Sequence, residues 1–316
     1  MLRSGLRLAA LAALALLPSF PADAGALPAT VLEAVTTIHD ASADPVDGVR
    51  DGTEQMRFAG VNFGEQPNLV VTAMHRLIPS GAPRETVARS GCTTPVCAAD
   101  AVFGAGIGAR LIRLYVVYGF NGSHLGRPGV KPWSVGELDS ILGALADAPL
   151  DTPREERLLL RDDRLDRFRG TLAIAAPAGT DLVAINGAGD IGLRFGATWA
   201  AMTPAQQRAA ALHELAHELA RTRGRAEGWS AMWSEAALAD AFLARRAGLQ
   251  TSRVSRYAMT SLAEDFAESV VAYRYAPQLL KQRAPNRLRI LREIVFRETP
   301  PVAVAATQSA QAASSM

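Results

Sequence analysis

Two histidines and a glutamate lie at a spacing that can hold a metal ion, in the run His-Glu-Leu-Ala-His at residues 213–217. On an α-helix, residues four apart share a face and lie about 6 Å apart along the axis, so both imidazoles can reach one ion. Glu214 lies one position further round, where its carboxylate can contact a metal-bound water without becoming a ligand. The pattern predicts a zinc site with His213 and His217 as ligands and Glu214 as general base.

A helix with two surface histidines that bind nothing would show the same spacing. Its surroundings argue against that interpretation, because Leu212, Leu215 and Leu219 are apolar and a buried His or Glu needs a partner. A catalytically inactive zinc-binding scaffold or interaction protein is a second alternative. It leaves no role for Glu214 or for an open coordination position, both of which a catalytic zinc uses.

A catalytic zinc needs a third protein ligand, and the sequence offers several downstream carboxylates. The candidates are Glu227, Glu235 and the cluster Glu264-Asp265-Phe266-Ala267-Glu268. Glu264 and Glu268 lie four apart on a predicted helix, so one could bind the metal while the other orients a ligand. Glu264 would also be explained without a metal, as the third residue of a capping box that begins at Ser261. From the residues alone the choice stays open.

The segment Tyr257–Glu268, together with the histidine motif before it, resembles the anthrax lethal-factor-like family of gluzincin metallopeptidases. In that family the third zinc ligand is the first Glu of an E-x-F-A-E motif, which falls on Glu264 here. The resemblance further implies that Glu268 supports the ligands and that Tyr257 stabilises the oxyanion or protonates the leaving group. It spans roughly residues 105–297, is specific only around the two motifs, and does not carry over the toxin's protein targets. As an isolated residue, Tyr257 is equally explained as a partly buried aromatic beside a helix start.

Local signals predict the helix that must position the histidines. Thr203 is a good N-cap, Gln206 completes a capping box with it, and Gly224 is a natural stop. A second capping box, formed by Ser134 and Glu137, opens an earlier amphipathic helix. The histidine motif is therefore expected in the middle of a helix.

These elements predict an α+β, zincin-like metallopeptidase domain over residues 105–299, mostly helical with a small mixed sheet. Strand-like runs within residues 171–185 supply a candidate edge strand, which could bind extended substrate by strand addition. Residues 25–104 are interpreted as an accessory N-terminal segment, and residues 300–316 as a disordered tail.

The N-terminus predicts export. Arg3 and Arg7 precede an apolar run over residues 8–17, and residues 22–24 (Ala-Asp-Ala) form an A-x-A cleavage site. This pattern is typical of a signal peptide, here residues 1–24. The run is shorter than the about 20 residues that span a bilayer, so we expect no stable membrane span after cleavage, and a periplasmic or secreted protein.

The two cysteines, Cys92 and Cys97, enclose Pro95. In an oxidising compartment we expect them to form a disulfide. A two-thiolate metal site is the rival interpretation, but no further cysteine or nearby histidine completes it. A loop this short has little closure entropy to remove, so the stabilisation should be modest.

The charge balance bears on the partner. The formal net charge of +2 gives no electrostatic case for nucleic acid, so we expect a protein or peptide substrate. The predicted reaction is hydrolysis of peptide bonds by water on Zn2+, with Glu214 passing a proton to the leaving amine. We expect an endopeptidase, because no motif for holding a free substrate amine is visible. A secreted toxin or effector protease is a further alternative.

Overall fold

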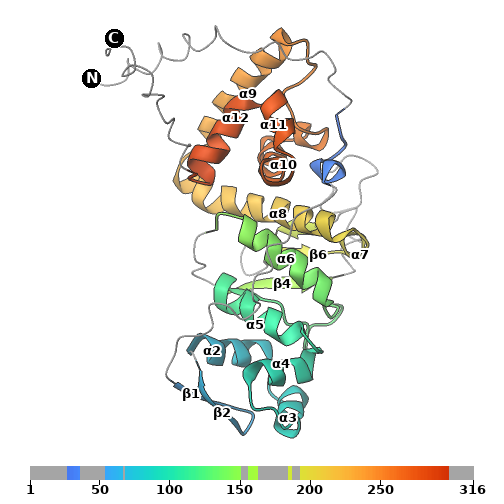
Figure 1. Ribbon diagram of the computed structural model, residues 1–316, viewed down its shortest axis with the longest axis vertical. Coiled ribbons are helices and arrows are strands. Elements are labelled where there is room, and N and C mark those ends of the chain that lie inside the picture. The colour runs from blue at the N-terminus through green and yellow to red at the C-terminus, as the bar shows by residue number, and fades with distance from the viewer. Residues whose placement is uncertain are drawn as a thin grey trace, which may run out of the picture.

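The fold is an elongated stack of helices with two small sheets, as Figure 1 shows. The structure is a computed structural model, and it describes residues 27–35, 54–66, 68–150, 156–162, 184–186 and 193–298. The α+β class predicted from the sequence is confirmed. The predicted signal peptide, the predicted tail and most of residues 171–185 lie outside the described residues.

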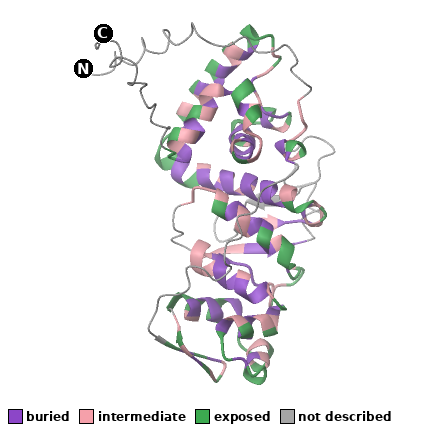
Figure 2. Cartoon of the chain, in the orientation of Figure 1, coloured by how far each residue is buried: buried purple, intermediate pink, exposed green. Residues whose placement is uncertain are grey.

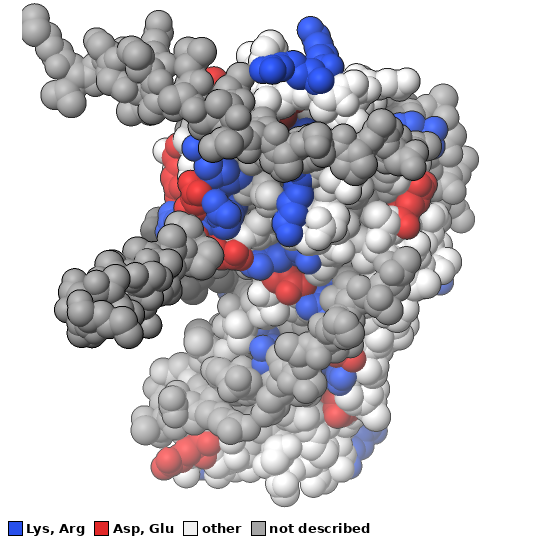
Figure 3. Space-filling view, turned by 45° about the horizontal axis from the view of Figure 1, so that its top comes forward, with Lys and Arg blue, Asp and Glu red and all other residues white. Residues whose placement is uncertain are grey.

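The middle of the stack is the most buried part of the chain. Helix α8 (Pro204–Leu219) runs through it as a largely buried band (Figure 2). On the face drawn in Figure 3, basic and acidic side chains are interspersed and do not form one basic surface.

No single described helix is long and apolar enough to cross a membrane. Helices α4 (Pro95–Phe103) and α5 (Ile107–Tyr118) reach that length and hydropathy only when taken together, and the chain bends by 116° between them.

One end of the stack is a hairpin with short helices. Its elements are β1 (Glu54–Phe58), β2 (Val61–Gln66), α2 (Asn68–Leu77) and α3 (Ala82–Arg89). Helix α5 packs against α2 and α4 on one side and against α6 (Val135–Asp147) on the other. It therefore links this end to the part of the chain that carries the histidine motif.

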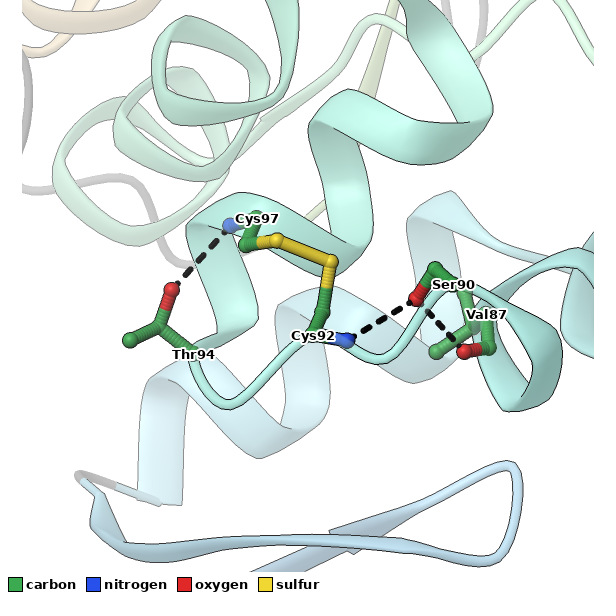
Figure 4. Close-up of a disulfide and its surroundings, with 5 residues drawn as sticks. All are labelled: Val87, Ser90, Cys92, Thr94 and Cys97. Atoms are coloured by element: carbon green, nitrogen blue, oxygen red, sulfur yellow. Dashed lines mark hydrogen bonds between the residues drawn. A yellow bond between two sulfur atoms is a disulfide. The ribbon is translucent and has the colours of Figure 1, made fainter.

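The predicted disulfide is present and joins the turn before α4 to its first helical turn (Figure 4). The Cα atoms of Cys92 and Cys97 are 5.5 Å apart. Thr94 caps the same helix, because its Oγ1 accepts a hydrogen bond from the Cys97 N–H at 3.2 Å. Ser90 accepts a bond from the Cys92 N–H at 3.3 Å, so both ends of the small loop are fixed.

A four-stranded mixed sheet lies beside the middle helices. Its strands are β3 (Phe120–Asn121), β4 (Arg157–Arg161), β5 (Ala184–Asn186) and β6 (Leu193–Phe195), in the order β3-β4-β6-β5. The first three in that order are parallel, whereas β5 runs antiparallel to β6. Among the described residues β3 and β5 are the two terminal strands, and β5 lies against α8.

Helix α8 begins where the sequence predicts. Thr203 Oγ1 accepts a hydrogen bond from the Gln206 N–H at 3.3 Å, and Gln206 Oε1 accepts one from the Thr203 N–H at 3.2 Å. The second predicted capping box, between Ser134 and Glu137, opens α6 in the same way. Helices α6 and α8 pack along each other, so two well-defined helix starts fix the layer that carries the histidines.

The predicted helix stop at Gly224 is wrong. The chain continues through a π-helical turn, η4 (Ala220–Gly224), and stays helical to residue 226. Gly228 makes the turn instead, with φ at +71°. Gly224 is small for a different reason, because a Cβ there would lie 2.8 Å from the Trp229 ring. A packing requirement explains the glycine that the sequence presents as a stop signal.

The other end of the stack is helical. Its elements are α9 (Trp229–Arg246), η5 (Tyr257–Met259), α10 (Leu262–Tyr275), α11 (Pro277–Arg283), α12 (Pro285–Ile290) and η6 (Leu291–Val295). The short helix α7 (Ala197–Ala200) lies instead in the middle of the stack, beside β6 and α8 (Figure 1). Helix α10 crosses α8 in close contact (Figure 1). The short 3₁₀ helix η2 (Val31–Ala34) lies against both of them and away from the hairpin. Part of the predicted accessory segment therefore belongs to the site region.

A buried arginine ties the C-terminal helices together. Arg287 on α12 is fully buried, and its Nε donates to Asp240 Oδ2 on α9 at 3.1 Å. Its guanidinium also donates to Asp265 on α10 and to the Ser252 carbonyl. The Trp233 indole N–H donates to the same Asp265 carboxylate at 2.8 Å. The network fixes the first turn of α10 against α9 and α12.

Replacing Arg287 with Ala should destabilise the protein by about 3–5 kcal/mol, because the buried Asp240 carboxylate loses its cation and Asp265 keeps only the Arg253 cation. Arg289→Ala is the matched control, since Arg289 is exposed on the same helix. Urea unfolding of both variants measures the difference in free energy of unfolding. Equal values for the two variants would contradict the role assigned to Arg287.

Candidate metal centre

The crossing of α8 and α10 brings three predicted ligands together. His213 and His217 point from α8, with their Nε2 atoms 3.1 Å apart. Glu264 lies in the first turn of α10, and its Oε2 is 2.9 Å from His213 Nε2 and 3.3 Å from His217 Nε2. Among the described residues, these three form the group of His, Cys, Asp or Glu side chains close enough to share an ion.

The three donor atoms fit a zinc ion. Zinc binds imidazole nitrogen and carboxylate oxygen at about 2.0–2.2 Å in tetrahedral geometry, which places two ligand atoms roughly 3.3 Å apart. The separations of 2.9–3.3 Å lie close to that value. Two histidines and one glutamate are also a known catalytic donor set, which leaves a fourth position for water.

The rival acidic candidates are placed elsewhere. Glu227 Oε2 accepts from the Trp229 indole N–H at 3.0 Å, and its other oxygen faces Arg297 at 2.7 Å. Glu235 is exposed on α9. The capping interpretation of Glu264 is half realised, because its N–H donates to Ser261 Oγ at 3.1 Å. Its carboxylate Oε2, however, faces the histidines, so capping explains the backbone of Glu264 and not its side chain.

Glu268 lies behind His213, one helical turn beyond Glu264. Its Oε1 is 3.2 Å from His213 Nδ1, and its side chain is almost fully buried. With Nδ1–H donating to this carboxylate, the imidazole presents the lone pair of Nε2 to the ligand triangle. The position agrees with the supporting role that the resemblance implies.

The site is electrostatically suited to a cation. Burial lowers the pKa of His213, but its hydrogen bonds to Glu264 and Glu268 outweigh burial and raise that pKa to about 10. Burial alone would raise the pKa of Glu264, yet the hydrogen bonds to both histidines hold it well below its usual range. The Glu264 carboxylate therefore stays ionised and favours positive charge between the rings.

Tyr257 borders the same site from η5. Its ring centroid lies 5.9 Å from that of His213. Burial raises the pKa of the Tyr257 hydroxyl, and the charges of Glu264, Glu214 and Glu268 raise it further. The hydroxyl is therefore protonated at neutral pH and can donate a hydrogen bond.

Glu214 lies between the two histidines in sequence and is partly exposed, whereas His213 is buried. Its charge raises the pKa of both His213 and Tyr257, which places its carboxylate near each of them. A partly exposed carboxylate beside the ligands can reach water. A general base needs such access to water.

Several contacts of two buried glutamates, Glu268 and Glu218, lie outside what the sequence indicates. Glu268 Oε2 accepts from Ser255 Oγ at 2.6 Å and from the Val31 N–H at 2.7 Å. Buried Glu218, directly after His217, pairs with Arg157 on β4 and with Arg221, whose Nη2 lies 2.6 Å away. Val31, Ser255 and Arg157 follow no local pattern with their acidic partners. The helical i,i+3 spacing of Glu218 and Arg221, and the position of Glu218 beside a ligand, were the available signals.

Comparison with known proteins agrees with this geometry. Residues 192–297 match the family model described as glucose-regulated metallo-peptidase M90. The match includes both helices that carry the site, so this part of the chain is similar to metallopeptidases. The match does not support the narrower assignment to the lethal-factor-like family. The residue roles that the resemblance to that family implies therefore stay predictions. Neither a curated protein nor a solved structure matches the chain.

Glu264→Ala should abolish stoichiometric zinc binding, because it removes one of three ligands. Glu235→Ala, the matched control on an exposed part of α9, should bind zinc as the parent does. Metal analysis after dialysis, followed by competition with a chromogenic chelator, measures both. The ligand assignment fails if Glu264→Ala keeps its zinc or if Glu235→Ala loses it.

Proposed function

We propose that the protein is a zinc-dependent peptidase in which His213, His217 and Glu264 hold the metal and Glu214 is the general base. The observation that carries the proposal is the convergence of two imidazole nitrogens and one carboxylate oxygen within 3.3 Å of one another. The match of residues 192–297 to a metallopeptidase family supports the same class. The substrate class that follows is a protein or peptide.

The residues around the ligands supply the rest of the reaction. Zinc held by His213, His217 and Glu264 would polarise the substrate carbonyl and lower the pKa of water, so that the water would give up a proton more readily. The Glu214 carboxylate takes a proton from the attacking water and delivers it to the nitrogen of the leaving amine. The Tyr257 hydroxyl, kept protonated by its surroundings, donates to the carbonyl oxygen as that oxygen gains negative charge. A scaffold without activity would need neither side chain.

Endopeptidase action is the favoured form of this activity. Strand β5 is one of the two terminal strands of the described sheet, and it is the one that lies against the site helix α8. A substrate backbone added to such an edge would lie extended, with its side chains directed to alternate faces. This mode holds the chain on both sides of the cleaved bond. It does not require a free amino terminus.

Export to an oxidising compartment is part of the proposal. The basic start, the apolar run and the A-x-A site in residues 1–24 support it. The disulfide between Cys92 and Cys97 supports it independently, because such bonds are rare in reducing compartments. We therefore propose a periplasmic or secreted peptidase.

Glu214→Gln should lower kcat by about 10²–10⁴-fold, the usual contribution of a general base, while zinc stays bound. Glutamine keeps the size of the side chain but cannot accept the proton. Cleavage of a mixed peptide library, read by mass spectrometry, measures activity, and metal analysis measures zinc. Glu235→Gln, the same change at an exposed position, should behave as the parent. Undiminished cleavage by Glu214→Gln would overturn the mechanism.

Tyr257→Phe should lower kcat by about 100-fold and leave KM nearly unchanged, because the lost hydrogen bond acts on the transition state. Tyr273→Phe is the control, since the Tyr273 hydroxyl bonds to Glu298 at the far end of α10. Steady-state kinetics on one cleaved peptide separates the two constants. A rise in KM at constant kcat would show that Tyr257 only binds substrate.

A further inference from the structure

The described segment at residues 27–35 reaches the site from the far end of the sequence. The Tyr257 N–H donates to the Ala29 carbonyl at 2.9 Å, and the Arg256 N–H donates to the Pro28 carbonyl at 3.0 Å. The Val31 N–H donates to Glu268 Oε2 at 2.7 Å in a buried contact. Two residues that border the metal site are thus bonded to one short stretch of chain.

The hydrogen bond from Val31 to Glu268 acts on the proposed ligand His213 through the Glu268 carboxylate. One oxygen of the Glu268 carboxylate accepts from Val31 N–H and Ser255 Oγ, which leaves the other oxygen to His213 Nδ1. Both oxygens of a buried carboxylate need donors, since an unsatisfied charge there is costly. Donors on Oε2 therefore fix the carboxylate plane, and that plane fixes the tilt of the His213 ring.

The Val31 amide is available for this bond because of its place in η2. It is the first N–H of the helix, and such groups have no partner within the helix. The Val31 side chain is fully buried and η2 packs on both α8 and α10, so the amide is held in place. The bond joins a backbone N–H to a carboxylate. The residue type at position 31 therefore does not reveal the bond in the sequence.

We infer that residues 27–35 are a positioning element of the metal site. The Val31 N–H orients Glu268 and through it His213, and the Pro28 and Ala29 carbonyls hold the backbone that places Tyr257. This inference rests on the proposed function, because it assigns the segment to the same zinc site. Cleavage after residue 24 would leave the segment in place.

Val31→Pro tests the inference, because it removes the N–H donor, although it also changes the buried side chain. Proline is favoured at the first position of a helix, and Thr30 already has the extended conformation that precedes proline, with φ −131° and ψ 163°. Val31→Ala is the matched control, which keeps the N–H and loses the side-chain packing. Zinc affinity is measured by competition with a chelator, and the unfolding temperature is measured on the zinc-free proteins.

Val31→Pro should weaken zinc binding by about tenfold or more, the usual effect of losing an outer partner of a ligand. Val31→Ala should weaken zinc binding much less, because the N–H that bonds to Glu268 remains. In the Glu268→Gln background, Val31→Pro should reduce zinc affinity much less, because both substitutions act through the same carboxylate. Equal affinities of the proline and alanine variants, or additive effects with Glu268→Gln, would overturn the inference. A parent protein that binds no zinc would overturn the proposed function as well.

Hydrogen exchange on the parent protein covers the case in which Val31→Pro does not fold. The peptide spanning residues 27–35 should exchange more slowly when zinc is added, because the ion locks His213 and hence Glu268 and the Val31 amide. A peptide from the β1–β2 hairpin serves as the internal reference. Exchange at residues 27–35 that does not respond to zinc would overturn the inference, while zinc binding itself would leave the proposed function standing.

Discussion

The site depends on the crossing of α8 and α10. Helix α8 alone brings two imidazoles together, but only the crossing places Glu264 Oε2 within 3.3 Å of both ring nitrogens. Because the ligands come from two helices, each interaction that fixes α10 against its neighbours also fixes the ligand triangle. Asp265, bonded to buried Arg287, holds the first turn of α10, and Glu268 holds the next turn against His213.

Two acidic side chains near the triangle, Glu218 and Glu268, are buried with their own partners. Glu218 pairs with Arg157 and so links the end of α8 to the sheet, while Glu268 receives donors from three separate segments. Buried ion pairs give little net stability, since apolar residues of similar size often serve as well. Their value here lies in orientation, because each pair fixes the direction of a helix or of a ligand ring.

Features set by neighbouring residues were predictable from the sequence, whereas those set by distant contacts were not. The start of α8 at Thr203 and the disulfide at Cys92 follow from local spacing and are confirmed. The stop at Gly224 was wrong because packing against a distant ring, not turn chemistry, requires that glycine. Glu264 could be singled out only through a resemblance, since capping explained it equally well. The donor at Val31, which lies 237 residues from its acceptor, gave no signal.

A crystal structure of the zinc-loaded protein, with anomalous scattering recorded at the zinc edge, tests the central claim most directly. The account predicts one ion at about 2.0–2.2 Å from His213 Nε2, His217 Nε2 and Glu264 Oε2, with a water completing a tetrahedron. An ion bound elsewhere, or one held by the two histidines while the Glu264 side chain points away, would contradict it.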